Sequence, residues 1–156
     1  MALSFEDLTM GREKLYGDEF TEEISDNLEE LLLFMQLFEA GLEVSFEVAS
    51  GWRPPALNGR VHGAKKSLHQ YGLACDISDR DGKLRQKCLG NLGLAQKLGI
   101  YFEDFRWTRG WVHMQIRPPR SRKRIFIPYA DQTAYPMNAA EAWDGSYDPQ
   151  FDGDLS

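Results

Sequence analysis

A stretch of about twenty residues with helically spaced apolar side chains constrains the fold more than any other part of the sequence. Thr21 is a good N-cap residue, two glutamates follow it in what would be the first turn, and Gly41 ends the pattern. The apolar residues between them recur every three or four positions: Ile24, Leu28, Leu31, Leu32, Phe34, Met35 and Phe38. This spacing predicts an amphipathic helix over residues 21–41 whose apolar face belongs to the core.

The remaining segments show shorter strand and helix patterns. Residues 43–49 alternate apolar and polar side chains, which predicts a half-buried strand. We expect further strands over residues 73–77, 100–102, 111–116 and 124–127, one helix over 83–98, loop or short helix over 1–20, and a loop over 58–66. Because no strand-helix-strand repeat links these segments, the sequence predicts an α+β fold, with a small antiparallel sheet and flanking helices.

Length and composition are those of a globular protein. The 156 residues, 42% of them hydrophobic, suffice for one sizeable core. We expect a monomer with a single domain over residues 1–130 and an acidic C-terminal tail over 131–156. No apolar run reaches the roughly 20 residues that span a bilayer. The first residues have no basic region followed by an apolar run, so we expect synthesis in the cytoplasm without a signal peptide.

The net charge of −6 is unevenly distributed along the chain. Residues 1–50 carry 13 acids and 2 bases, residues 51–130 carry 5 acids and 16 bases, and residues 131–156 carry 6 acids and no base. These regions either pair with one another within the fold or leave a basic surface that attracts an anionic polymer. No nucleic-acid motif is visible, so we expect neither nucleic acid nor a membrane as a partner.

Two histidines and an aspartate form the most informative set of polar residues. His69 and Asp76 lie seven residues apart, and Gly72 between them allows a tight turn. His113 lies in the predicted strand 111–116, where a free imidazole would be poorly solvated. Two imidazoles and one carboxylate suit a tetrahedral zinc ion that keeps a fourth position for water. The alternative is a core histidine satisfied by a single hydrogen bond.

The two cysteines predict no disulfide framework. Cys75 stands beside Asp76 and could be taken for a fourth ligand. Alternation along a strand would point the two side chains to opposite faces. We therefore expect Cys75 to be a buried structural thiol.

The residues around this set resemble a known family. The chain resembles the zinc D-alanyl-D-alanine carboxypeptidase-like peptidases, which include phage L-alanoyl-D-glutamate endolysins, vancomycin-resistance D,D-dipeptidases and the hedgehog signalling domain. The resemblance covers roughly residues 43–128 and rests on three motifs: Ser50-Gly51-Trp52-Arg53, Ser67-x-His69-x-x-Gly72-x-Ala74-x-Asp76 and Trp111-Val112-His113. It implies a hedgehog- or D,D-peptidase-like fold.

The resemblance also implies roles for individual residues. His69, Asp76 and His113 would bind one zinc ion per chain. Arg53 would stabilise developing negative charge or hold a substrate carboxylate, because its planar, charged fork suits that task. Ser67 would hydrogen-bond near the substrate. Gln115, in the strand that carries His113, is a further predicted substrate-binding residue.

One position departs from the family pattern. Many members place the general base, a Glu or Asp, three residues before the last ligand, and here that residue is Gly110. Hydrolysis still needs a group that takes a proton from water. The nearest upstream carboxylates are Glu103 and Asp104, and one of them would face His113 if the two strands pair as a hairpin. We favour Asp104 over Glu103; the alternative is that both acids pair with nearby arginines.

The resemblance, together with the predicted zinc ligands, implies a zinc metallopeptidase that hydrolyses amide bonds in the stem peptides of peptidoglycan and acts on the cell wall. A bacteriophage-type endolysin that cuts L-alanoyl-D-glutamate bonds fits best. A D,D-carboxypeptidase or D,D-endopeptidase is the alternative within the same class. A non-catalytic zinc-bearing module, for binding or as a virion component, is the alternative outside it, and Gly110 is the residue that keeps it open.

Overall fold

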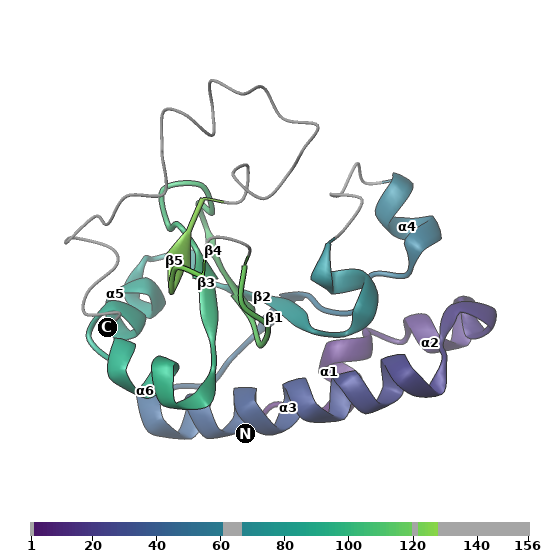
Figure 1. The fold of residues 1–156 in the computed structure, drawn as a ribbon, viewed down its shortest axis with the longest axis horizontal. Coiled ribbons are helices and arrows are strands. Elements are labelled where there is room, and N and C mark those ends of the chain that lie inside the picture. The colour runs from purple at the N-terminus through teal and green to yellow at the C-terminus, as the bar shows by residue number, and fades with distance from the viewer. Residues whose placement is uncertain (1, 61–66, 120–121, 128–156) are drawn as a thin grey trace. The chain divides into compact units, whose positions relative to one another are not determined.

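The computed structural model describes residues 2–60, 67–119 and 122–127 (Figure 1). Its contacts divide the chain into two compact units, residues 1–78 and 79–156. The first unit contains α1 (Phe5–Thr9), α2 (Arg12–Leu15), α3 (Glu22–Leu42), β1 (Val48–Ser50), α4 (Pro55–Arg60), β2 (Ala74–Ser78), and two 3-10 helices at Gly17–Glu19 and Leu68–Tyr71. The second contains α5 (Lys83–Leu89), α6 (Leu92–Leu98), β3 (Tyr101–Glu103), β4 (Trp111–Gln115) and β5 (Ile125–Phe126).

The predictions of an acidic tail and of no membrane-spanning segment can be compared with these residues only in part. The acidic tail at 131–156 and the expected domain boundary at residue 130 lie outside the described residues. Within the described part of the chain, no helix combines the length and the apolar character needed to cross a membrane.

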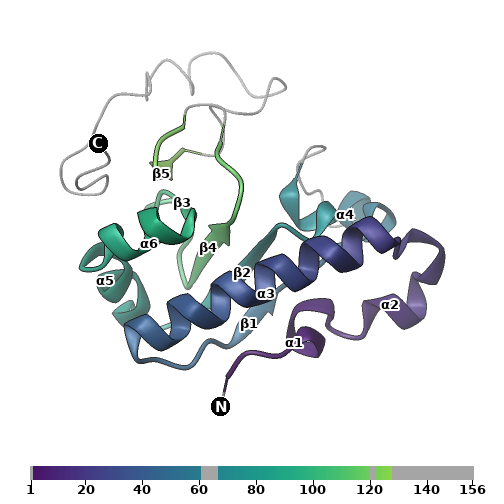
Figure 2. The same cartoon turned by 60° about the horizontal axis from the view of Figure 1, so that its bottom comes forward.

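The predicted helix over residues 21–41 is confirmed as α3. The Thr21 hydroxyl accepts a hydrogen bond from the backbone N–H of Ile24, which caps the helix as expected. The helix runs through Gly41 to Leu42, and Glu43 ends it in the left-handed conformation. Its buried apolar residues are Leu28, Leu31, Met35, Phe38 and Leu42. Figures 1 and 2 show this helix lying along β1 and β2 of the first unit.

The strand predicted over residues 43–49 is much shorter in the structure. Only Val48–Ser50 is extended as β1, where Val48 pairs with Ile77 and Ser50 with Asp76 of β2 in an antiparallel ladder with an irregular register. The reason lies in Glu39, a buried residue of α3. Its carboxylate accepts hydrogen bonds from the N–H of Phe46, at 2.6 Å, and from that of Leu3, at 3.0 Å. The N–H of Phe46 is therefore bonded to a side chain.

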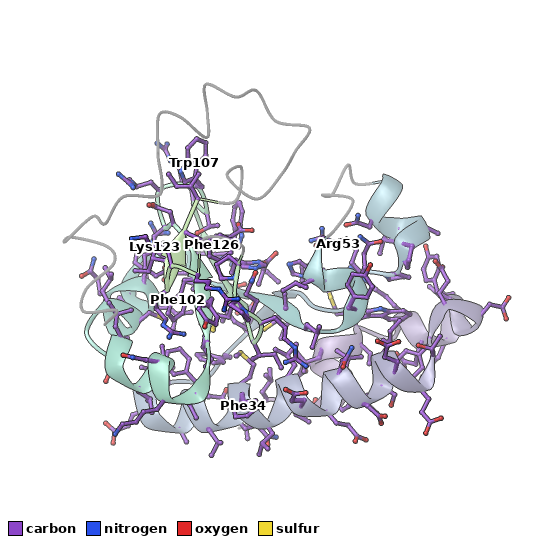
Figure 3. The ribbon with its side chains drawn as sticks, in the orientation of Figure 1. Phe34, Arg53, Phe102, Trp107, Lys123 and Phe126 are labelled. Atoms are coloured by element: carbon purple, nitrogen blue, oxygen red, sulfur yellow. The ribbon has the colours of Figure 1, made fainter. Side chains whose placement is uncertain are left out.

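The turn after β1 buries its aromatic residue and presents its arginine. Trp52 is fully buried, its Nε1 donates to the carbonyl of Gln70, and its ring meets Phe20 edge to face. Arg53 lies on the opposite side of the β1–β2 pair from Phe34 of α3 (Figure 3). Helix α4 then begins at Pro55, a residue whose fixed φ suits a first helical position. The loop predicted over residues 58–66 is therefore wrong for residues 58–60, which belong to α4. Residues 61–66 lie outside the described residues.

In the second unit, the single helix predicted over residues 83–98 is two helices, α5 and α6. Gly90 and Asn91 separate them. Glycine is a poor helix former, and the Asn91 side chain donates to the carbonyl of Lys87, at 2.8 Å, in competition with the backbone. Both helices lie beside the strands of this unit in Figures 1 and 2.

The strands of the second unit follow the predicted segments closely. β3 pairs antiparallel with β4, with Tyr101 opposite Gln115 and Phe102 opposite Met114, and it pairs in parallel with β5. Phe102 packs against Phe105 at a centroid distance of 5.6 Å. With helices set apart from mostly antiparallel strand pairs, the predicted α+β fold is confirmed.

The two cysteines are free and buried, one in each unit. Burial raises the pKa of the Cys75 thiol far above its ordinary value, and it does the same for Cys88. Both thiols therefore stay neutral and packed in the core. The expectation of a buried structural thiol at Cys75 is confirmed.

Candidate metal centre

His69 lies on a short 3-10 helix whose ends the motif residues define. The Ser67 hydroxyl accepts a hydrogen bond from the His69 N–H, at 3.2 Å, and so caps the start. Gly72 ends it with a φ of +74°, and a Cβ there would come within 2.8 Å of the Leu28 side chain. The glycine is needed for both conformation and space. Ser67 thus holds the backbone of His69, while its contact with substrate stays a prediction.

The ring of His69 is oriented by a backbone carbonyl. His69 is buried, and its Nδ1 lies 2.9 Å from the carbonyl oxygen of Gly51. Because a carbonyl can only accept, Nδ1 is the donor in this contact, and Nε2 is the ring nitrogen that remains for a metal. The sequence did not indicate this contact, apart from the glycine at residue 51, which lets the backbone come close.

The second ring nitrogen of His69, Nε2, faces the carboxylate of Asp76. The distance from His69 Nε2 to Asp76 Oδ1 is 3.3 Å, and Asp76 is 13% exposed. Two ligand atoms on a tetrahedral zinc ion with bonds of about 2.0–2.1 Å lie roughly 3.3–3.4 Å apart. The donor types, the orientation of the ring and the spacing of this pair therefore fit zinc.

Arg53 lies beside this pair and is held by neutral partners. Its guanidinium donates to the side-chain oxygens of Asn58, at 3.1 Å, and Ser50, at 3.3 Å. Its NH2 group is 4.0 Å from Asp76 Oδ2, and its backbone N–H donates to the carbonyl of His69. The described residues thus bring together three of the predicted site residues, His69, Asp76 and Arg53, within the first unit.

In the second unit, His113 is oriented by Gln115. Both residues are buried, and His113 Nε2 lies 2.8 Å from Gln115 Oε1. The amide nitrogen of Gln115 donates to the carbonyl of Arg117, which fixes the oxygen toward His113. Nε2 therefore carries the proton and Nδ1 offers the lone pair. This orienting contact was not foreseen for Gln115, and its contact with substrate stays a prediction.

The two candidate carboxylates have different surroundings. Glu103 Oε1 lies 3.8 Å from Nδ1 of His113, the nitrogen that does not contact Gln115. Asp104 is buried and accepts three hydrogen bonds from Arg106, from its backbone N–H, its Nε and its NH2 group. Continuing the β3–β4 register puts Glu103 opposite His113. The contacts thus favour Glu103, the reverse of the preference drawn from the sequence, while both roles stay predictions.

Gly110, at the family's usual base position, is built into the backbone of the β3–β4 loop. It has a φ of +91°, and its carbonyl accepts a hydrogen bond from the N–H of Asp79. The Asp79 carboxylate holds Arg85, whose guanidinium donates to the loop carbonyls of Phe105 and Thr108. The loop is thus tied to the start of α5 by the buried carboxylate of Asp79.

With a histidine–carboxylate pair suited to zinc, an arginine beside it, and an α+β fold, the chain has the features of a zinc metallopeptidase. A family model described as Peptidase M15 matches residues 3–115, and the chain belongs to that family. The resemblance stated from the motifs is confirmed, and the match extends it to the N-terminal helices. The family implies zinc dependence and action on the peptides of peptidoglycan. No curated protein and no solved structure is similar enough to the chain to count as a match.

Proposed function

We propose that this protein is a zinc-dependent peptidoglycan peptidase of the phage endolysin type, which cuts L-alanoyl-D-glutamate bonds in the stem peptides of a host cell wall. The observation that carries the metal chemistry is the pair formed by His69 Nε2 and Asp76 Oδ1, 3.3 Å apart. The family match supports the peptidase activity and the class of substrate. The particular bond and the phage origin are the further step of the proposal.

The proposed ligands are His69 Nε2, Asp76 Oδ1 and His113 Nδ1. His69 and Asp76 form the pair described above in the first unit, and His113 joins them on the strength of the Trp111-Val112-His113 motif. The contact that each imidazole makes through its other nitrogen supports the assignment, because it turns His69 Nε2 and His113 Nδ1 toward a carboxylate oxygen. A bound zinc ion would polarise the scissile carbonyl and lower the pKa of its water from 15.7 toward about 7.

The protein's own side chains would handle the proton and the negative charge. Glu103 would take a proton from water and return it to the leaving amine, a role that its 3.8 Å approach to His113 supports. Arg53 would meet negative charge at the site, either on the oxygen that becomes negative during hydrolysis or on a substrate carboxylate, because its guanidinium is beside Asp76 and is held in place by Ser50 and Asn58.

Digestion of purified cell walls, with mass spectrometry of the fragments, tests the proposal. We expect fragments with new N-terminal D-glutamate, loss of all cleavage in the presence of a chelator, and recovery when zinc is added back. Release of D-alanine instead would identify a D,D-carboxypeptidase. A protein that holds about one zinc ion per chain yet leaves every wall intact would be the non-catalytic module that Gly110 keeps under consideration.

Isosteric amide variants should identify the proton-transfer group. Glu103→Gln is expected to lower kcat by about 10²–10⁴-fold, because the amide cannot accept the proton. Asp104→Asn is the matched control: its carboxylate is bonded to Arg106, so thermal stability should fall while kcat changes far less. Steady-state kinetics on soluble wall peptides, with zinc content measured in parallel, checks this. A large kcat loss in Asp104→Asn with full activity in Glu103→Gln would restore the preference drawn from the sequence.

A further inference from the structure

Arg12, in the first turn of α2, reaches across forty residues to the turn that carries Arg53. Its NH1 group donates to the carbonyl of Trp52, at 2.7 Å, the residue directly before Arg53. The turn is also bonded to α1, because the N–H of Trp52 donates to the carbonyl of Leu8. The guanidinium of Arg12 is therefore delivered to the neighbourhood of the candidate metal centre by tertiary contacts.

The positive charge of Arg12 is half-buried and lacks a carboxylate partner among the described residues, where its one hydrogen bond goes to a neutral carbonyl. Desolvation lowers the pKa of Arg12, and the charge of Arg53 lowers it further. Arg12 and Arg53 thus place two positive charges close to one turn. Charges of one sign gathered in this way create a positive potential that attracts an anion.

Arg53 does not relieve this excess of positive charge. Its hydrogen-bond partners Ser50 and Asn58 are uncharged. The carboxylate of Asp76 lies 4.0 Å from Arg53 and only 3.3 Å from His69, and in the proposed function it is a metal ligand. Its negative charge would thus be shared with the metal.

We propose that Arg12 and Arg53 together bind a carboxylate group of the peptide substrate. This inference rests on the proposed function and deepens it by assigning a site for the substrate's free acid. Guanidinium groups bind carboxylates through paired, charge-assisted hydrogen bonds. Holding the Trp52 carbonyl needs only one of the five N–H groups of Arg12, and an uncharged donor could do it without the burial of a charge.

The test compares one peptide in two forms, with free carboxylates and with the same groups converted to amides. In Arg12→Gln, KM for the acid should rise about 10- to 100-fold, the effect of losing hydrogen bonds to a charged group, whereas KM for the amide and kcat for both should stay nearly unchanged. Arg12→Lys, which keeps the charge, should retain most of the preference. Lys14→Gln, an exposed residue of the same helix, is the matched control and should leave the preference intact.

A binding measurement separates this inference from the proposed function. Calorimetric titration of the zinc-loaded protein with the cleaved peptide acid and with its amide needs no turnover, so the preference for the acid and its loss in Arg12→Gln can be measured even if no wall is cut. Equal affinity of the unmodified protein for acid and amide would overturn the inference. An equal loss for both forms in Arg12→Gln would do the same, and would leave Arg12 as a support for the Trp52 carbonyl.

Discussion

The His69→Ala protein is expected to bind no zinc at stoichiometric concentrations and to lose wall-hydrolysing activity by at least about 10³-fold. The variant removes the Nε2 lone pair that faces Asp76 Oδ1, and a site that keeps two of its three protein ligands no longer fixes the ion. Metal analysis after dialysis gives the zinc content, and release of soluble peptide from walls gives the activity.

Two further variants show whether the loss comes from the ligand itself. Asp76→Asn keeps the shape of the side chain but removes its charge, so it should also lose zinc. Tyr71→Phe lies on the same 3-10 helix as His69, at a half-exposed position, and should keep a full complement of zinc. Normal zinc affinity in both His69→Ala and Asp76→Asn would overturn the assignment of these ligands.

The second large effect is expected from Gly51→Ala. A Cβ atom at residue 51 would lie 2.0 Å from the carbonyl oxygen of Leu8, far inside contact distance, and backbone would have to move. The move would strain the hydrogen bond from Trp52 N–H to Leu8 and displace the Gly51 carbonyl that orients His69. We expect a loss of about 3 kcal/mol in the free energy of unfolding and a 10- to 100-fold weaker affinity for zinc.

Gly93→Ala is the matched control for this substitution. Gly93 lies in α6, and a Cβ there would meet nothing within 4 Å. Alanine should therefore stabilise the protein by about 0.5 kcal/mol, because it favours the helix over the unfolded chain. Urea unfolding of both variants, monitored by circular dichroism, measures the two changes. If Gly51→Ala unfolds at the same urea concentration as the unmodified protein, the close contact between residue 51 and α1 is wrong.

The elements predicted well from the sequence are those specified by neighbouring residues. Helix α3 carries its own cap at Thr21 and its own apolar face, so local spacing sufficed. The strand predicted over residues 43–49 was too long, because the N–H of Phe46 donates to the carboxylate of Glu39. An alternating strand pattern does not indicate such a contact. The break at Gly90 and Asn91 shows the same limit, since the apolar spacing continued across it.

The candidate site divides in the same way. His69 and Asp76 were identified from a motif because both lie in one ten-residue stretch. The groups that orient the ligands were not, since the Gly51 carbonyl and Gln115 act through contacts that depend on the folded backbone. The choice between Glu103 and Asp104 turned on strand register and on the competing bonds of Arg106. Arg12 lies forty residues from the turn that it contacts, so no local pattern could have indicated it.

The backbone conformation at Gly110 disfavours the acidic residue that many members of the resembled family place at that position. With a φ of +91°, a glutamate there would carry strain on the order of 1–2 kcal/mol, while the carbonyl is bonded to Asp79. Exchanging the two arrangements thus requires the loop and the side chain to change together.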